Sequence, residues 1–329
     1  MAVRQFDWRD LPTLRRYRQE SVFLDSELLL TRGSQQMTGA LFSYLAPSLG
    51  IFTCVSNGET SLDGRMIGQF IHPAGSPFSH LTFLAPLTAL ESCSISPLVE
   101  FMMVLSGERG ALRLLADVDE QSLAFEALRR CGFVVYSRQC IWQLDGPPVA
   151  SASKPTWRLL ADQDMIPVRN LYNNLVPGLV QQIEPFAQSK AALPRGLVYY
   201  RNGELLAFVE LKFGQRGIWV QPFIHPDTGD VQQYLLDLLD KIPDRRSRPV
   251  YICVRSYQAW LELAIDELGG KAGPRQAVMA RQLVTPQRVE RMFALPALEG
   301  GQAEVPAPLS SAAAHLELVK RYATKEDNG

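Results

Sequence analysis

Apolar runs short enough for β-strands alternate with amphipathic helical patterns along the first 144 residues of the chain. The amphipathic patterns predict helices at 13–20, 95–106 and 123–131, and a further helix within the apolar segment 24–47, with a loop near 33–36. The apolar runs predict strands at 2–6, 50–55, 66–72, 80–84, 112–116 and 133–144. This alternation predicts a mixed α/β fold.

The clearest local signals lie in the segment 111–144. Asp117 and Asp119 follow its first apolar run and are the expected N-cap residues of the next helix. Gly132 stands just after the last periodic residue, where a glycine in the left-handed conformation commonly ends a helix. The strand expected to follow has a polar break in its apolar pattern at 137–139.

The same order of signals returns in the second half of the chain. Asp10, just before Pro12, is the expected N-cap of the first helix, and Asp162 and Asp164 hold the matching place after a strand at 156–160. The later pattern predicts strands at 196–201, 205–213, 217–224, 250–254 and 277–284, and helices at 231–241 and 258–268. A repeat of this length indicates two copies of one domain rather than a solenoid.

Residues 1–144 and 156–285 are therefore expected to form two domains of one design. The length of 329 residues also favours two domains, at the usual size of about 150 residues each. The three prolines and small polar residues of 145–155 are typical of a linker. From 286 to 329 the pattern ends in low-complexity sequence, which predicts a largely disordered tail.

Composition narrows the classes of partner and chemistry. The 33 basic and 34 acidic side chains nearly balance, so net charge gives no reason to expect a nucleic-acid or membrane-surface partner. The five cysteines have no CxxC spacing and the four histidines no HExxH spacing, so we expect reduced, buried thiols and no metal site. The N-terminal segment is charged and no apolar run is long enough to span a bilayer, which favours a cytoplasmic protein.

The strand, the capped helix, the Gly132-Phe133 pair and the next strand resemble the C-terminal half of the GCN5-related N-acetyltransferase (GNAT) superfamily, whose helix commonly ends in Gly-Phe. The repeat extends this resemblance over nearly all of 1–285, as a tandem of two domains. The resemblance implies two mixed, mostly antiparallel sheets flanked by helices. It also implies acetyl-CoA or another acyl-CoA as the donor and an amine as the acceptor. The alternative is a chance repetition of generic α/β units.

Members of this superfamily typically carry a glycine-rich loop after the fourth strand, whose backbone N–H groups bind the donor pyrophosphate at a helix start. In the first half the corresponding segment, 85–91, has no glycine and includes an acid. In the second half, 225–231 keeps one glycine. There the resemblance implies donor-binding backbone groups at the helix start, namely Pro226, Thr228, Gly229, Asp230 and Val231. Asp227 and Asp230 would oppose a pyrophosphate, and an ordinary turn with an N-cap is the alternative.

The resemblance also bears on proton transfer. Many members carry a tyrosine four residues before the Gly-Phe glycine, where it can protonate the departing CoA thiolate. Leu128 and Ile265 occupy that position in the two halves, and neither can donate a proton. Glu210 is the best candidate for a general base, because apolar neighbours in its strand would raise its affinity for protons. The alternative is that Glu210 and Lys212 both face solvent.

Two classes of function follow from the sequence. The first is acyl transfer from acyl-CoA to an unidentified small-molecule or protein amine, with the second half the expected active one. The second is a non-catalytic protein of the same fold that binds a small molecule or another protein. A third reading has the first half complete the acceptor site of the second half.

Overall fold

The computed structural model describes residues 2–33, 50–57, 64–90, 95–145, 157–186 and 195–283. All of these belong to one compact unit, residues 1–285. The predicted tail, nearly all of the predicted linker and the second part of the segment 24–47 lie outside the described residues.

The elements of the first half follow the predicted order, except for a short strand at Val22–Phe23 that was not predicted. Its strands are β1 (Ala2–Gln5), β2 (Val22–Phe23), β3 (Ile51–Asn57), β4 (Met66–Ile71), β5 (Phe78–Ala85), β6 (Arg113–Asp119) and β7 (Val134–Leu144). Its helices are α1 (Leu11–Arg16), α2 (Ser26–Arg32), α4 (Ser96–Gly107) and α5 (Leu123–Arg130). After α5 the chain turns as predicted, with Gly132 at a φ of +82°. The Phe133 N–H donates to the Leu128 carbonyl at 3.0 Å.

The second half repeats this order, except that no strand among its described residues matches β2. Its strands are β8 (Trp157–Leu159), β9 (Gly196–Arg201), β10 (Glu204–Phe213), β11 (Ile218–Ile224), β12 (Val250–Arg255) and β13 (Lys271–Gln282). Its helices are α6 (Met165–Leu175), α7 (Gly178–Ile183), α8 (Val231–Lys241) and α9 (Leu261–Glu267). An ion pair marks the repeat near the start of each half. Arg4 binds Asp10 at 2.7 and 2.8 Å, and Arg158 binds Asp164 at 2.6 Å through two bonds.

Asp10 is the N-cap residue of α1, as predicted. Its buried carboxylate makes no capping bond to α1, because it binds the Arg4 guanidinium and accepts a bond from the Asp7 N–H. The predicted N-cap of α5 is wrong. Asp117 and Asp119 lie within β6, and the Ser122 hydroxyl caps α5. The strand continues through both aspartates because it gains partners from distant parts of the chain.

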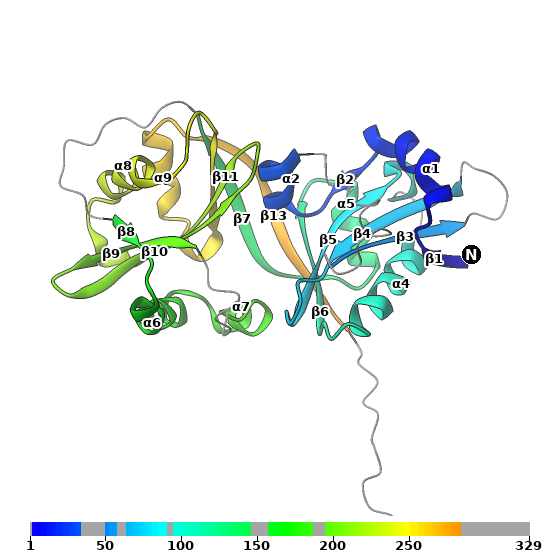
Figure 1. Ribbon diagram of the computed structural model, residues 1–329, viewed down its shortest axis with the longest axis horizontal. Helices are drawn as coiled ribbons and strands as arrows, with labels where there is room; N and C mark the ends of the chain where they lie inside the picture. Colours follow the sequence, from blue (N-terminus) through cyan, green and yellow to red (C-terminus); the bar gives the residue numbers. More distant parts are fainter. Residues whose placement is uncertain are drawn as a thin grey trace, which may run out of the picture. The chain divides into compact units, whose positions relative to one another are not determined.

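The described strands form one mixed sheet flanked by helices, in the order β1-β3-β4-β5-β6-β13-β7-β12-β11-β10-β9-β8, with β2 paired to β5 (Figure 1). The pairs β5–β6 and β11–β12 are parallel. The other pairs are antiparallel. The predicted mixed α/β fold is confirmed.

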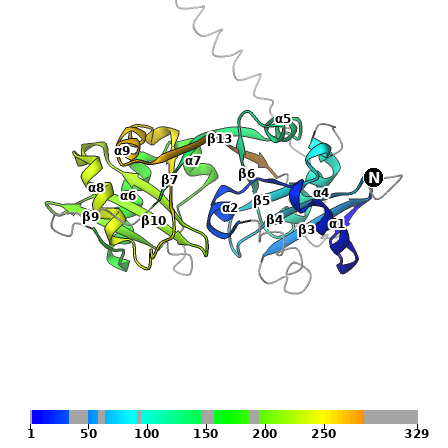
Figure 2. The same ribbon diagram turned by 90° about the horizontal axis from the view of Figure 1, so that it is seen from above.

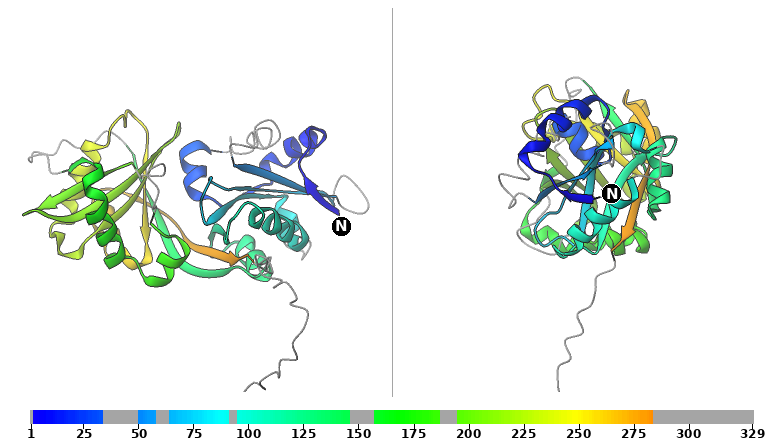
Figure 3. Two further views of the ribbon diagram at one scale, coloured as in Figure 1. Left: turned by 60° about the horizontal axis from the view of Figure 1, so that its bottom comes forward. Right: turned by 90° about the vertical axis from the view of Figure 1, so that its right-hand side faces the viewer.

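The last strand of each half pairs with the other half. β7 follows α5 of the first half but pairs with β12, whereas β13 follows α9 of the second half but pairs with β6. The two strands also pair with each other (Figure 2), and β13, drawn in orange, reaches the first half (Figure 3). Pairing with β7 makes β13 begin at Lys271, earlier than predicted. β7 stays paired with β13 through the polar residues 137–139, where Gln139 Nε2 donates to Gln276 Oε1 at 2.9 Å.

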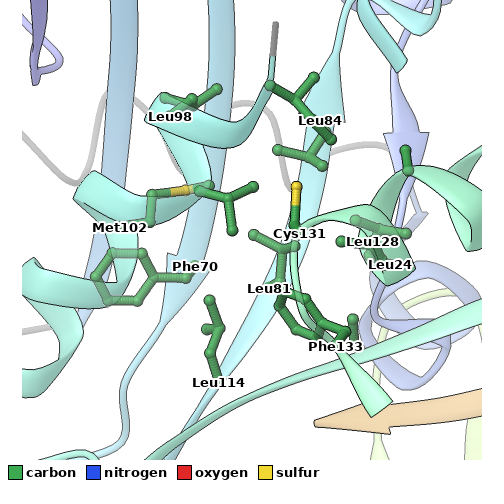
Figure 4. Close-up of a cluster of buried hydrophobic side chains, with 14 of the residues drawn as sticks. Leu24, Phe70, Leu81, Leu84, Leu98, Met102, Leu114, Leu128, Cys131 and Phe133 are labelled. Carbon is green, nitrogen blue, oxygen red and sulfur yellow. The ribbon is translucent and has the colours of Figure 1, made fainter. Parts of the chain in front are cut away.

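Hydrophobic cores lie on both faces of the sheet. On one face α4 and α5 pack over the core of the first half (Figure 4), and α8 and α9 pack over that of the second. On the other face α1 and α6 contribute to two smaller cores. Polar side chains of the central strands face this second side, including Gln139 and Gln276. Polar side chains are therefore found on this face at the centre of the sheet.

Candidate functional site

Each half contains two neighbouring parallel strands that are paired over three residue pairs and then separate. β5 and β6 stay paired as far as His80, and β11 and β12 as far as Val220. We call the opening between β5 and β6 beyond His80 the first fork, and the opening between β11 and β12 beyond Val220 the second fork. Backbone groups along the open edges need other hydrogen-bond partners, because buried groups left unpaired are costly.

The chain itself fills the first fork. Val22 and Phe23 form β2, which pairs antiparallel with the open edge of β5. The Leu24 N–H donates to the Thr82 carbonyl at 2.8 Å, and the Leu24 carbonyl accepts from the Asp117 N–H of β6 at 2.8 Å. The Leu24 side chain is fully buried in the core of the first half (Figure 4). Main chain therefore bridges both arms of this fork.

Side chains bridge the second fork. The Gln258 carboxamide donates to the Pro222 carbonyl at 2.8 Å and accepts from the Ile224 N–H at 3.0 Å. Gln258 lies between β12 and α9 and is only 1% exposed. Gln221 Nε2 donates across the fork to the Cys253 carbonyl of β12 at 3.3 Å. The two forks thus differ in what occupies them.

The described part of the first-half segment 85–91 uses its backbone donors within the chain. The Leu87 N–H donates to the Glu20 carbonyl at 2.7 Å, and the Ala89 N–H donates to the Pro86 carbonyl at 3.1 Å. An anion would need such donors. This segment therefore fits a pyrophosphate poorly, in keeping with its lack of glycine.

The segment with the predicted donor-binding residues directly follows the second fork. Pro226 to Thr228 form one turn of 3-10 helix, and Gly229 follows with a φ of +91°. Asp230 caps α8 by accepting a bond from a first-turn N–H at 3.3 Å, and Val231 is the first residue of the helix. All five predicted residues are thus adjacent to the fork and at a helix start.

Charge at this helix start has both signs. Arg201 of β9 donates to the carbonyls of Asp227 and Thr228 at 2.7 and 3.1 Å. A Cβ placed on Gly229 would lie 3.9 Å from Arg201 Nη1. The guanidinium and the helix N-terminus favour an anion, whereas the carboxylates of Asp227 and Asp230 oppose one. The residues present therefore fit a pyrophosphate in part.

Glu210, the predicted base, lies in β10 opposite Gln221 of the second fork. Its side chain is 28% exposed, and burial raises its pKa, while Lys212 at 3.8 Å acts against the rise. Lys212 is 46% exposed and also binds Glu27 of α2 at 2.7 Å. A first-half carboxylate therefore reaches the strand that carries Glu210.

A partly buried ion pair lies near the end of β12. Arg255 Nη2 contacts both carboxylate oxygens of Glu184 at 3.1 Å, and the Tyr136 hydroxyl of β7 donates to the same carboxylate. Burial acts to raise the pKa of Glu184, but Arg255 and Tyr136 outweigh it and lower the pKa. Arg255 Nη1 is buried and has no hydrogen-bond partner among the described residues. This pair joins a first-half strand to two second-half residues.

Two aspartates of the first half carry strongly shifted pKa values. Burial raises the pKa of Asp25, which caps α2, to about 7. Burial also raises the pKa of Asp117 to about 6, although Arg255 opposes the rise. The two groups are linked through Ser26, whose N–H donates to Asp117 Oδ2 at 3.3 Å. Burial lowers the pKa of His80, on which the Asp117 charge acts in the opposite sense. Such shifts are typical of functional sites but also of buried structural clusters.

The positions where the superfamily often has a tyrosine lie in the cores. Leu128 and Ile265 are both fully buried. Tyr136 and Tyr257 are the nearby tyrosines, and burial raises the pKa of each. Tyr257 packs against the smaller core of the second half, beside Gln258 in the sequence.

Sequence reasoning did not identify the glutamines that bridge the second fork, the partly buried ion pair, or the two aspartates with raised pKa values. The missed residues are Gln221, Gln258, Glu184, Arg255, Asp25 and Asp117. Asp117 and Arg255 each follow an apolar run, and a charged residue at the end of a predicted buried strand could have indicated a functional site. Gln258 gave no such indication, because its partners are backbone groups more than thirty residues earlier in the chain.

Other expectations concern thiols, metals and membranes. Cys54, Cys131, Cys140 and Cys253 are free and buried, as predicted for the four cysteines that are described. Within the described ranges, no group of three or more His, Cys, Asp or Glu side chains is placed to hold a metal ion. In the same part of the chain, no helix has the length and apolar character needed to cross a membrane.

No protein-family model and no curated protein matches the chain. It is similar to a solved GCN5-related N-acetyltransferase from Sphaerobacter thermophilus, with 10% identity, a TM-score of 0.49, and coverage of 86% of this chain and 95% of that one. It is also similar to a tandem GNAT protein from the clavulanic acid biosynthesis pathway, with 14% identity, a TM-score of 0.49 and coverage of 86% and 98%. For a GNAT-family acetyltransferase from Colwellia psychrerythraea the identity is 12%, the TM-score 0.43 and the coverage 86% and 100%. The names of all three proteins include GCN5-related N-acetyltransferase or its abbreviation, GNAT.

Proposed function

We propose that this protein transfers an acyl group from acyl-CoA to an amine, with the donor bound at the second fork. The observation that carries the proposal is the difference between the forks, because main chain through Leu24 fills the first whereas the Gln258 side chain spans the second. Arg201 and the helix start at Gly229 add groups that favour a pyrophosphate. Acetyl-CoA is the donor to test first.

Acyl transfer needs a group that accepts a proton from the attacking amine. The amine nitrogen attacks the thioester carbonyl, a C–N bond forms, the C–S bond breaks, and CoA leaves as its thiolate. Glu210 takes the proton that the nitrogen loses, and the thiolate takes a proton from solvent. The raised pKa of Glu210 makes it a stronger base than an ordinary surface carboxylate.

The acceptor side is proposed to use both halves. Glu27 of the first half holds Lys212 at 2.7 Å, and Lys212 lies 3.8 Å from Glu210. This contact supports the reading in which the first half completes the site of the second. The first half itself is proposed to be inactive, because its own fork is filled.

A non-catalytic binding protein is the second candidate. Gln258 already satisfies the edge of β11 that a donor would use. Asp227 and Asp230 also place negative charge beside the helix start. Both features act against an acyl-CoA ligand.

Isothermal titration with acetyl-CoA tests the proposal, with Gly229→Asp beside Gly203→Asp as a matched control. Both glycines have positive φ, +91° and +85°, so both substitutions strain the backbone. We expect binding to weaken at least roughly tenfold in Gly229→Asp alone, because only that carboxylate faces the donor pyrophosphate. Equal weakening in both variants would assign the effect to strain.

Glu210→Gln separates chemistry from binding. It should leave acetyl-CoA binding unchanged and lower thiol release with a panel of amines about a hundredfold. No heat with millimolar acetyl-CoA in the unmodified protein would instead favour the non-catalytic candidate.

A further inference from the structure

The two forks present hydrogen-bonding groups at matching positions. His80 and Val220 are the last residues of β5 and β11 in the parallel pairs, so Thr82 and Pro222 each stand two residues further on. Each of these two carbonyls accepts a hydrogen bond of 2.8 Å. The donor is a main-chain N–H in the first fork and a side-chain amide in the second.

One carboxamide thus replaces a peptide segment in the second fork. In the first fork, β2 adds to the edge of β5 with Val22 opposite Leu84. In the second, Gln258 supplies both a donor to Pro222 and an acceptor for Ile224. In the second fork, one side chain pairs with the N–H and C=O groups of the strand edge. Rotation about the torsion angles of that side chain can remove it from the edge.

We propose that the Gln258 carboxamide is an internal place-holder for an amide of the acyl donor, and that it leaves β11 when the donor binds. CoA carries two secondary amides in the arm that ends at its thiol, and an extended ligand adds to a strand edge through such groups. An amide of this arm can donate to the Pro222 carbonyl and accept from the Ile224 N–H, so neither buried group stays unpaired. The inference rests on the proposed function, because it takes acyl-CoA as the ligand.

A place-holder changes donor affinity in a definite direction. The donor binds only molecules in which Gln258 has turned away, so the apparent Kd exceeds the intrinsic Kd by the inverse of that fraction. Removing the competing carboxamide should tighten binding by about tenfold, the scale of one or two ordinary hydrogen bonds. A merely structural role predicts weaker binding, because the fork would be damaged.

Titration of the full chain with acetyl-CoA compares the unmodified protein with Gln258→Ala and with Gln69→Ala as control. Gln69 is also 1% exposed, and its Nε2 donates to the Thr53 hydroxyl at 3.0 Å in the first half. We expect tighter binding in Gln258→Ala and unchanged binding in Gln69→Ala.

Proton exchange in the unmodified protein gives a second measurement that needs no variant. With acetyl-CoA at saturation, the Gln258 side-chain amide should exchange faster with water while the Ile224 N–H remains protected. A Gln258 amide that stays protected in the saturated complex overturns the inference.

The titration separates the inference from the proposed function. Equal or weaker binding to a folded Gln258→Ala, when the unmodified protein binds acetyl-CoA, overturns the place-holder and leaves the proposed donor site standing. No binding to either protein at millimolar acetyl-CoA overturns both.

Discussion

Leu24→Ala should lower the free energy of unfolding by about 3 kcal/mol. Leu24 is fully buried and packs in the core of the first half with Leu81, Leu84 and Leu128 (Figure 4). Truncating a buried leucine removes its transfer free energy and leaves a cavity, which together cost roughly 2–5 kcal/mol. The main-chain bonds of Leu24 survive the substitution, so this magnitude reflects side-chain packing alone.

Chemical denaturation measures this loss, with Leu112→Ala as the control. Leu112 is 46% exposed, and its truncation should change the free energy of unfolding by no more than about 0.5 kcal/mol. Hydrogen exchange at the Asp117 N–H, which donates to the Leu24 carbonyl, gives a local readout and should become faster in Leu24→Ala. A loss below about 1 kcal/mol with unchanged exchange would refute the reasoning that the buried Leu24 side chain anchors the segment that fills the first fork.

The pH dependence of stability should change in two further variants, each measured by denaturation at several pH values. The hydrogen bond from Arg158, with smaller contributions from the Ala161 N–H and the Tyr200 hydroxyl, lowers the pKa of Asp164 in the folded protein to about 2. The ionised carboxylate therefore stabilises the fold above about pH 4, and this contribution to the free energy of unfolding is lost as the pH falls towards 2. Asp164→Asn should remove this acid dependence and lower the free energy of unfolding by about 1–2 kcal/mol at neutral pH. This range is reduced because Arg158 is partly exposed to solvent. An unchanged acid dependence in Asp164→Asn would contradict the prediction. Burial raises the folded pKa of Asp117 to about 6, so its contribution is greatest below about pH 4 and falls as the pH rises through 6. Asp117→Asn should therefore lose less stability than the unmodified protein between about pH 4 and 8, and parallel curves would argue against this.

Local pattern was sufficient where the structure depends on neighbouring residues. α8 has the predicted bounds, Val231–Lys241, because its apolar spacing and its capping Asp230 both lie within a few turns. Gly132 ends α5 for the same local reason. Asp117 was predicted to cap a helix because its strand partners, Leu24 and β13, are far away in the chain.

The candidate site shows the same limit. Glu210 and Gly229 were found from sequence through the apolar strand and the superfamily resemblance, and their roles stay predictions. Gln258 was not found, because a glutamine after a strand looks like any surface residue until its partners, Pro222 and Ile224, are known.

The sequence by itself determined most of the order of helices and strands, its recurrence in the second half and the mixed α/β fold, because periodicity and capping act over a few residues. It did not reveal the short elements β2 and α7. Only the tertiary structure decided that β7 and β13 pair across the halves, that Leu24 fills the first fork and that Gln258 spans the second. A strand edge needs N–H and C=O partners but does not specify their source. Main-chain or side-chain groups from any part of the protein can supply these partners. Which group does so depends on how the whole chain packs.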